Sequence, residues 1–183
     1  FPTAYWGSRF TTSQVEEYLA SVETISYTPV DAIETLARLL KEDHVIGYFD
    51  GAAEVGPRAL CHRSILANPT KKENLDRVNN IKGREHWRPL APVIKEDRFY
   101  DIVKMNQLSP FMLIAGEVKE EWRSKIPAVT HVDNTCRPQS VNKTQNLIIH
   151  EALTLFEKET GCPVFMNTSF NLRGEPIVDS PKD

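Results

Sequence analysis

The sequence contains no apolar run near the roughly 20 residues that a membrane-spanning helix needs. It has only three cysteines, Cys61, Cys136 and Cys162, which are odd in number, widely spaced and without a Cys-x-x-Cys pair. This pattern argues against a disulfide framework or a structural zinc site and favours buried or loop thiols in a reducing compartment. We therefore expect a cytoplasmic protein with no membrane partner.

Two common phosphate-binding fingerprints are also missing, because neither Gly-x-x-x-x-Gly-Lys-Ser/Thr nor Gly-x-Gly-x-x-Gly occurs. A phosphate site would therefore have to be built from side chains and polar turns. The 183 residues, 40% hydrophobic and 26% charged, fit one globular domain. The sequence does not begin with Met and ends on Ser180-Pro181-Lys182-Asp183, so we expect a piece of a larger protein.

Apolar periodicity and capping residues predict interleaved helices and strands, which indicates an α/β fold. The predicted helices cover 13–20, 29–42, 71–82, 96–103 and 146–161, with Ser13 and Glu16 forming a capping box and Asn146 and Gly161 closing the last helix. The predicted strands cover 44–49, 64–67, 90–94, 111–118 and 163–166.

Positive charge is concentrated in one part of the chain. Residues 56–98 hold ten Lys or Arg against five Asp or Glu, a balance of +5, whereas the whole chain is −3 and the remainder is −8. Five of these cations, Arg58, Arg63, Lys82, Arg84 and Arg88, lie in GPRALCHRSILANP (56–69) and IKGREHWRPLAP (81–92), where Gly and Pro interrupt any helical spacing. Because such cations match phosphate oxygens, we predict a site for a phosphorylated small molecule rather than a solvated basic face.

Individual residues of these blocks suggest how such a site is built. Gly56-Pro57-Arg58 predicts a rigid turn that presents an arginine, and Gly83 would let Lys82 and Arg84 reach one ligand. Arg88 precedes a predicted strand and would lie at its edge. Glu54 and Glu85 accompany these cations, and we expect them to form ion pairs with arginines rather than to take part in acid–base chemistry.

Two further polar segments are candidates. Asn167-Thr168-Ser169-Phe170-Asn171 follows an apolar strand and would either bind an anion or cap the next element. His131 and Asp133 would point to the same side if they lay on a strand, where they could share a proton or a metal. With no third ligand adjacent, we favour a hydrogen-bonded contact to substrate over a metal.

Several long motifs resemble the C-terminal region of the NodU/CmcH-type O-carbamoyltransferases: GPRALCHRSILANP, NNIKGREHWRPLAP, SPFM, THVDNTCRPQSV and PVFMNTSFNLRGEPIVDSP. The resemblance runs from about Tyr5 to Asp183. It implies a YrdC/Sua5-like α/β domain over 29–183, with a twisted mixed sheet flanked by helices and a truncated C-terminus. Residues 1–28 would then be the segment that joins it to an N-terminal Kae1-like domain.

The resemblance also implies a two-stage reaction. Carbamoyl phosphate and ATP, the latter with Mg²⁺, would give a carbamoyl-adenylate, with phosphate and pyrophosphate released. The carbamoyl group would then pass to a hydroxyl acceptor in the N-terminal domain, where a metal ion assists. We assign no metal ligand to this chain, and we expect it to be inactive in overall transfer without that domain.

The resemblance assigns roles residue by residue. The Lys-x-Arg and Ser-x-Asn signature of YrdC domains is matched by Lys82 and Arg84 and by Ser169 and Asn171. Lys82 and Arg84 would neutralise phosphate charge as the catalytic pair, while Ser169 and Asn171 would orient the nucleotide phosphate. The remaining candidates for binding nucleotide or carbamoyl phosphate are Arg58, His62, Arg63, Arg88, His131, Arg137, Asn167 and Thr168.

Two positions depart from the family pattern, since Cys61 and Asn134 stand where relatives commonly have glycine. A cysteine with positive φ would strain the turn and alter the arginine geometry, whereas asparagine tolerates that backbone better. Two alternatives to the enzyme remain: a fragment that is catalytically silent without its partner domain, and a nucleic-acid-binding module. The net charge of −3 and the absence of aromatic residues interleaved with the basic ones disfavour nucleic acid.

Overall fold

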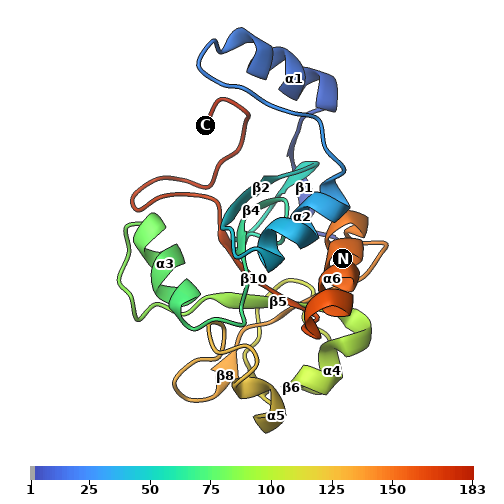
Figure 1. The fold of residues 1–183 in the computed structure, drawn as a ribbon, viewed down its shortest axis with the longest axis vertical. Coiled ribbons are helices and arrows are strands. Elements are labelled where there is room, and N and C mark those ends of the chain that lie inside the picture. Colours follow the sequence, from blue (N-terminus) through green and yellow to red (C-terminus); the bar gives the residue numbers. More distant parts are fainter. Residues whose placement is uncertain (1–2) are drawn as a thin grey trace.

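The computed structural model describes residues 3–183, and within this range a five-stranded mixed sheet forms the centre of the fold (Figure 1). The strands are ordered β2 (Ile46–Phe49), β4 (Arg63–Ala67), β10 (Val164–Ser169), β5 (Ala91–Lys95) and β9 (Gln139–Val141). Neighbouring strands are antiparallel except for the parallel pair β5–β9. All five residues of β4 and of β5 are buried, as expected for inner strands covered on both faces.

Two smaller sheets complete the strand content of the described range. β1 (Tyr5–Arg9) pairs antiparallel with β3 (Ala52–Glu54). β7 (Gly116–Val118) lies between β6 (Val103–Lys104) and β8 (Thr135–Cys136), again antiparallel. None of the β1, β3 or β8 segments was expected, because each is short and owes its pairing to a distant partner.

The helices are α1 (Thr12–Ser21), α2 (Ala32–Lys41), α3 (Glu73–Ile81), α4 (Phe99–Ile102), α5 (Glu120–Arg123) and α6 (Leu147–Thr160), with a 3-10 turn at Glu96–Arg98. α2 and α6 lie beside one another next to the central strands (Figure 1). Leu36 and Leu40 of α2 and Leu153 and Phe156 of α6 are buried in the core. Among residues 3–183, no helix has the length and apolarity to cross a membrane.

The prediction for α6 is confirmed at both ends. The Asn146 side chain accepts a hydrogen bond from the Ile149 amide at 3.0 Å, which caps the first turn. Gly161 has φ 74°, the left-handed conformation that ends a helix with little strain when the residue is glycine. These strong local signals explain why the sequence alone defines this element.

The capping box of α1 is shifted from the predicted position. Thr11, not Ser13, accepts from the Gln14 amide, and the Gln14 side chain accepts from the Thr11 amide. The sequence contains two overlapping Ser/Thr-x-x-Glu/Gln patterns, and the earlier one starts the helix. No residue of α1 is buried, and α1 stands apart from the sheet in Figure 1.

Other boundaries also differ from the predictions. The helix expected over 29–42 begins at Ala32, because the Asp31 carboxylate caps the Glu34 amide at 2.9 Å. The segment 96–103 forms a 3-10 turn and a short helix rather than one helix. Only Gly116–Val118 of the strand expected over 111–118 is extended, since Met112 adopts φ 53°. Segment 131–133 is a turn, so the placement of His131 and Asp133 on one strand was wrong.

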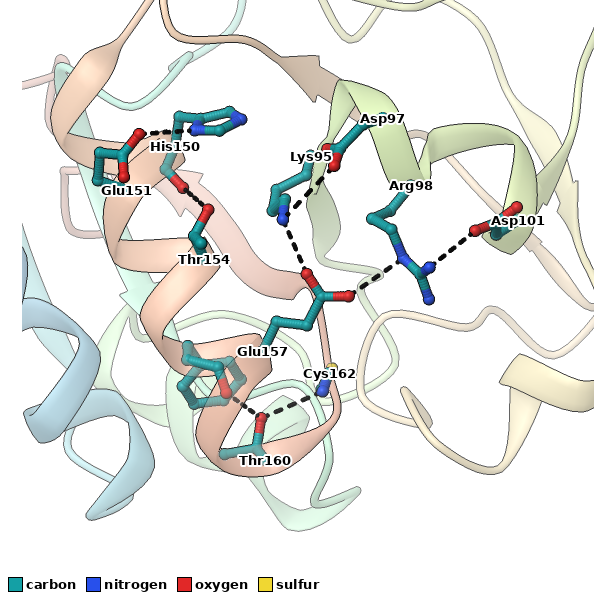
Figure 2. Close-up of polar contacts among 11 residues, drawn as sticks. Lys95, Asp97, Arg98, Asp101, His150, Glu151, Thr154, Glu157, Thr160 and Cys162 are labelled. Carbon is teal, nitrogen blue, oxygen red and sulfur yellow. Dashed lines mark hydrogen bonds and ion pairs between the residues drawn. The ribbon is translucent and has the colours of Figure 1, made fainter.

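The far end of β5 is fixed by an ion-pair cluster (Figure 2). The Lys95 ammonium, with its side chain 8% exposed, lies 2.8 Å from the carboxylate of Glu157 on α6. Arg98 contacts the other oxygen of Glu157 at 3.1 Å and also pairs with Asp101. The cluster therefore joins the C-terminal end of β5 to α6, whereas Ala91, at the other end of β5, faces the cavities described next.

Candidate functional site

Two adjoining cavities open where β10 ends, and most of the predicted site residues lie around them. The larger, of about 210 Å³, is lined by Lys82, Arg84, Arg88, Ser169 and Asn171, and we call it the lysine cavity. The smaller, of about 110 Å³, is lined by Arg58, Arg84, Arg137, Asn167, Thr168 and Ser169, and we call it the arginine cavity. Arg84 and Ser169 line both cavities, so the two form one continuous candidate site.

Lys82 is buried at the end of α3 and points toward the end of β10. Its ammonium donates to the Ser169 carbonyl, to the Asn171 carbonyl at 2.7 Å and to Asn171 Oδ1 at 2.9 Å. Gly83 has φ 62°, which lets the chain turn at once toward Arg84. The Ser169 hydroxyl donates to Asn171 Oδ1 at 2.6 Å, which completes the contact between the two predicted motifs.

The positive charge of this cluster is not neutralised by the protein. Every oxygen that binds the Lys82 ammonium is neutral, and burial together with the nearby Arg84 lowers the pKa of Lys82 to about 8. Burial, then Arg88, lowers the pKa of Arg84, whose Nε donates to Asn79 Oδ1 at 2.5 Å. Within residues 3–183 neither Lys82 nor Arg84 has an ion-pair partner, whereas Arg88 pairs with Glu85 at 2.9 Å, as expected for that glutamate. A cavity with uncompensated cations attracts anions.

The arginine cavity contains polar atoms without partners. The Nε atoms of Arg58 and Arg137 and the Oδ1 atom of Asn167 are buried and form no hydrogen bond within the described residues. Burial lowers the pKa of Arg137, and the nearby Arg58 lowers it further. Because buried polar atoms are almost always paired, three orphans at one small cavity indicate the binding of a polar ligand.

Two predicted ligand residues support the main chain instead of lining the cavities. The His62 ring stacks on Tyr5 at 3.5 Å between ring centres, and its Nδ1 donates to the Ala52 carbonyl at 2.7 Å. The Arg63 guanidinium lies 3.6 Å from the centre of the Phe49 ring. It donates to main-chain carbonyls of Asp50, His62, Ser8, Gly51 and Asp179.

His131 and Asp133 lie at a separate cavity of about 420 Å³, which Trp87 also lines. The Asp133 carboxylate accepts from the Thr135 hydroxyl at 2.7 Å, and His131 Nδ1 lies 3.3 Å from the same hydroxyl. Burial lowers the pKa of His131, against the opposing effect of Asp133. Within residues 3–183 no group of three or more His, Cys, Asp or Glu is arranged to hold a metal ion.

A comparison with protein families identifies the chain. The model described as "Carbamoyltransferase C-terminus" matches residues 37–183, which is most of the sequence. The chain belongs to this family. The motifs of the sequence had indicated the same family.

Curated relatives place the chain within longer proteins. It is 45% identical to the nodulation protein NolNO of Sinorhizobium fredii, over 84% of this chain and 23% of that protein. It is 41% identical to the nodulation protein U of the same organism, over 81% of this chain and 27% of that protein. An uncharacterized protein of Synechocystis, sll1178, is 38% identical over 98% of this chain and 33% of that protein. The chain thus spans about a quarter to a third of the length of these relatives.

Solved structures confirm the expected fold. A full-length HypF in its phosphate- and nucleotide-bound form matches 83% of this chain and 19% of its own, with a TM-score of 0.55 and 16% identity. Sua5 of P. abyssi, solved with L-threonine, matches 82% of this chain and 42% of its own, with a TM-score of 0.54 and 15% identity. At this identity the likeness concerns the fold alone, which is the YrdC-like α/β fold.

Two residues behind the site were not predicted as functional. Glu54 was expected to pair with arginines, but its Oε1 instead accepts from the amides of Leu60, His62 and Arg63, at 2.6, 2.8 and 3.2 Å. Glu54 thereby shapes the loop that carries Arg58. Gln139, in the motif THVDNTCRPQSV, is buried beside Asn167, and its position in that motif is the signal that could have identified it.

Proposed function

We propose that this chain binds Mg-ATP and carbamoyl phosphate and forms a carbamoyl-adenylate, the activated donor for transfer to a hydroxyl acceptor. In this reaction water cleaves carbamoyl phosphate to carbamate and phosphate, and a carbamate oxygen then attacks the α-phosphate of ATP and displaces pyrophosphate. The observation that carries the proposal is a pair of cations without an ion-pair partner in the described residues, the buried Lys82 and the half-buried Arg84. Lys82 contacts Ser169 and Asn171, and Arg84 lines the same cavity. Both substrates of this reaction are phosphate anions, so a site with uncompensated cations suits them. The family supports a carbamoyl donor as substrate.

The two cations would act in different ways. The three ammonium hydrogens of Lys82 already bind Ser169 and Asn171, so Lys82 acts on a phosphate mainly through its charge and by holding this segment in place. Arg84 lines both cavities and can therefore contact groups bound in either. Fixed positive charge of this kind stabilises the negative charge that develops on a departing pyrophosphate without reorganisation during the reaction.

The nucleotide and the carbamoyl donor would occupy the two cavities side by side. We assign the ATP phosphates to the lysine cavity, where Arg88 and the hydroxyl of Ser169 are also present. Carbamoyl phosphate is assigned to the arginine cavity beside Arg58 and Arg137. The full-length HypF structure, one part of which shares this fold, was solved with phosphate and nucleotide bound.

Transfer to the acceptor would require residues beyond this chain. The relatives are three to four times longer, and we place the hydroxyl acceptor and the assisting metal in their N-terminal Kae1-like domain. The chain alone would then form the adenylate but not complete the transfer. Mg²⁺ enters this proposal as part of the Mg-ATP substrate.

The first experiment is a calorimetric titration of the chain with Mg-ATP, with and without carbamoyl phosphate. We expect saturable binding that Lys82→Ala weakens by about 10- to 150-fold, the loss of one charge-assisted interaction of roughly 1.5–3 kcal/mol. Arg38→Ala is the control, because Arg38 is exposed on α2 and forms an ion pair with Glu42, outside every predicted site motif. Absence of binding, or equal affinity in a folded Lys82→Ala protein, would contradict the proposal.

A further inference from the structure

Asn167 and Gln139 form a buried amide pair against the arginine cavity. Asn167 lies near the end of β10, 1% exposed, and Gln139 begins β9 and is 2% exposed. The Asn167 Nδ2 donates to the Ala59 carbonyl at 3.0 Å and to Gln139 Oε1 at 3.1 Å. The Gln139 Nε2 in turn donates to the Leu60 carbonyl at 3.1 Å.

Two main-chain carbonyls determine the orientation of both amides. A carbonyl oxygen can only accept a hydrogen bond, so the atom of Gln139 that faces Leu60 must be the nitrogen, which leaves Oε1 toward Asn167. By the same argument, the atom of Asn167 that faces Ala59 must be Nδ2. A rotated Asn167 amide would bring its oxygen against two acceptors. The remaining atom, Asn167 Oδ1, is therefore fixed as an acceptor, and it is buried without a hydrogen-bond partner among residues 3–183.

A ligand that pairs with Asn167 Oδ1 must supply a hydrogen-bond donor. The other polar atoms of the cavity show which acceptors the ligand must also carry. Arg58 and Arg137 line the same cavity, and in the described part of the chain each has a buried Nε–H without an acceptor. A matching ligand therefore presents an N–H group within a few bonds of oxygens that accept from guanidinium groups. A carbamoyl group has this pattern, since an amino donor and a carbonyl oxygen share one carbon and a phosphate follows.

We propose that Asn167 Oδ1 binds the amino group of carbamoyl phosphate and selects it against other acyl phosphates, with Gln139 as the residue that positions Asn167. This proposal rests on the proposed function and adds the group by which the donor is recognised. A site built to hydrogen-bond an N–H rejects a ligand that lacks it, because the buried oxygen is then left unpaired. Acetyl phosphate, with a methyl group in place of the amino group, is the ligand that such a site excludes.

The test compares the affinities of carbamoyl phosphate and acetyl phosphate by calorimetry on the wild-type chain, each without nucleotide. We expect carbamoyl phosphate to bind at least about tenfold more tightly. Equal affinity for the two would overturn the role of Asn167 while leaving the proposed function intact. Failure of carbamoyl phosphate to bind at all would overturn both. No substitution is needed for this comparison, so it cannot be confused by misfolding.

Two variants then assign the selectivity to its residues. Asn167→Leu has similar size without the acceptor, and we expect it to remove the tenfold preference while the affinity for Mg-ATP stays within about threefold of wild type. Gln139→Met leaves Asn167 chemically intact but removes one of the two acceptors that orient its amide, and the Ala59 carbonyl remains, so the preference should fall to an intermediate value. Gln107→Met, at an exposed turn residue, is the matched control.

The ratio of the two affinities separates recognition from a structural effect. A residue that only supports the fold would weaken both acyl phosphates together and keep their ratio. An unchanged ratio in Asn167→Leu would therefore overturn the proposal, as would an Asn167→Leu protein whose Mg-ATP affinity falls as much as its carbamoyl phosphate affinity. In the second case Asn167 would contact the nucleotide.

Discussion

Lys82 is a buried cation held only by neutral oxygens, and this determines how it responds to pH. Burial penalises the charged form, and the pKa of its ammonium is therefore about 8 in the folded chain, against 10.5 for an ordinary lysine. At a pH between these two pKa values, Lys82 is mostly protonated in the unfolded chain and mostly deprotonated in the folded chain. The contribution of Lys82 to stability therefore rises with pH over this window, and below about pH 8 its buried charge is a cost that a bound anion can offset.

The same shift predicts a pH dependence of nucleotide binding. Above about pH 8 the free chain loses the Lys82 charge, so the Kd for Mg-ATP should rise by up to about tenfold per pH unit. Calorimetric titrations from about pH 7.5 to 9.5 would measure it. In Lys82→Met the rise should be absent. Parallel profiles in the wild-type and variant chains would show that another group titrates.

Residues of the same motif have different roles in the structure, and the sequence could not predict which of them line the cavities. Lys82, Arg84, Ser169 and Asn171 were expected to meet, and the structure brings them together. In GPRALCHRS, however, Arg58 lines a cavity while Arg63 holds main-chain carbonyls. A sequence shows that a guanidinium is present but not which acceptors surround it, because those come from segments far along the chain.

Cys61 stands where relatives of the family commonly have glycine, and its backbone has the positive φ that strains a turn at a residue other than glycine. Cys61 is buried with φ 73°, and Asn134 has φ 64°, so both non-glycine residues occupy the left-handed region. The Cys61 side chain contacts Gln139 Oε1 at 3.5 Å, and its amide bonds the Ser64 hydroxyl at 3.0 Å. Cysteine at this position is therefore accommodated by packing against the residue that orients Asn167.

At the scale of elements, local signals defined α6 and the inner strands, while β1, β3 and the true length of β10 escaped prediction. Asn146 and Gly161 mark their helix whatever the rest of the chain does. β1 and β3 depend on a partner about fifty residues away, which no local pattern encodes. The extension of β10 through Asn167–Ser169 likewise depends on pairing with β4 and β5, and it turns an expected polar loop into a rigid strand end.

The ion-pair cluster that joins β5 to α6 should contribute strongly to the stability of the fold (Figure 2). Glu157→Gln would leave the buried Lys95 with only the more distant, exposed carboxylate of Asp97, 3.6 Å away, as an ion-pair partner in the described residues. We expect the free energy of unfolding to fall by about 3 kcal/mol in urea denaturation. Glu159→Gln is the matched control: Glu159 pairs with Lys41 at an exposed site and should cost at most about 1 kcal/mol. If both variants lost a similar free energy of unfolding, the prediction that the buried ion-pair cluster is the stronger of the two would be contradicted.

At the scale of the whole molecule, a single side chain ties together segments from both ends of the chain. The Arg63 guanidinium binds carbonyls of Ser8 and Asp179, which lie 55 and 116 residues away in the sequence. Figure 1 shows α1 and the C-terminal segment on the same side of the central sheet. These contacts join segments that are far apart in the sequence, so no local sequence pattern could have predicted them.

The long-range contacts of Arg63 also lead us to expect an order in which parts of the structure form during folding. Closing long stretches of chain costs entropy, so contacts of such large separation are expected to form after the barrier has been crossed. In stopped-flow experiments, Arg63→Met should therefore speed unfolding by about tenfold or more and leave the folding rate nearly unchanged. Arg38→Met should change neither rate, and slower folding of Arg63→Met with unaltered unfolding would place this contact in the nucleus. We expect the sheet to assemble first and the two ends of the chain to close around Arg63 last.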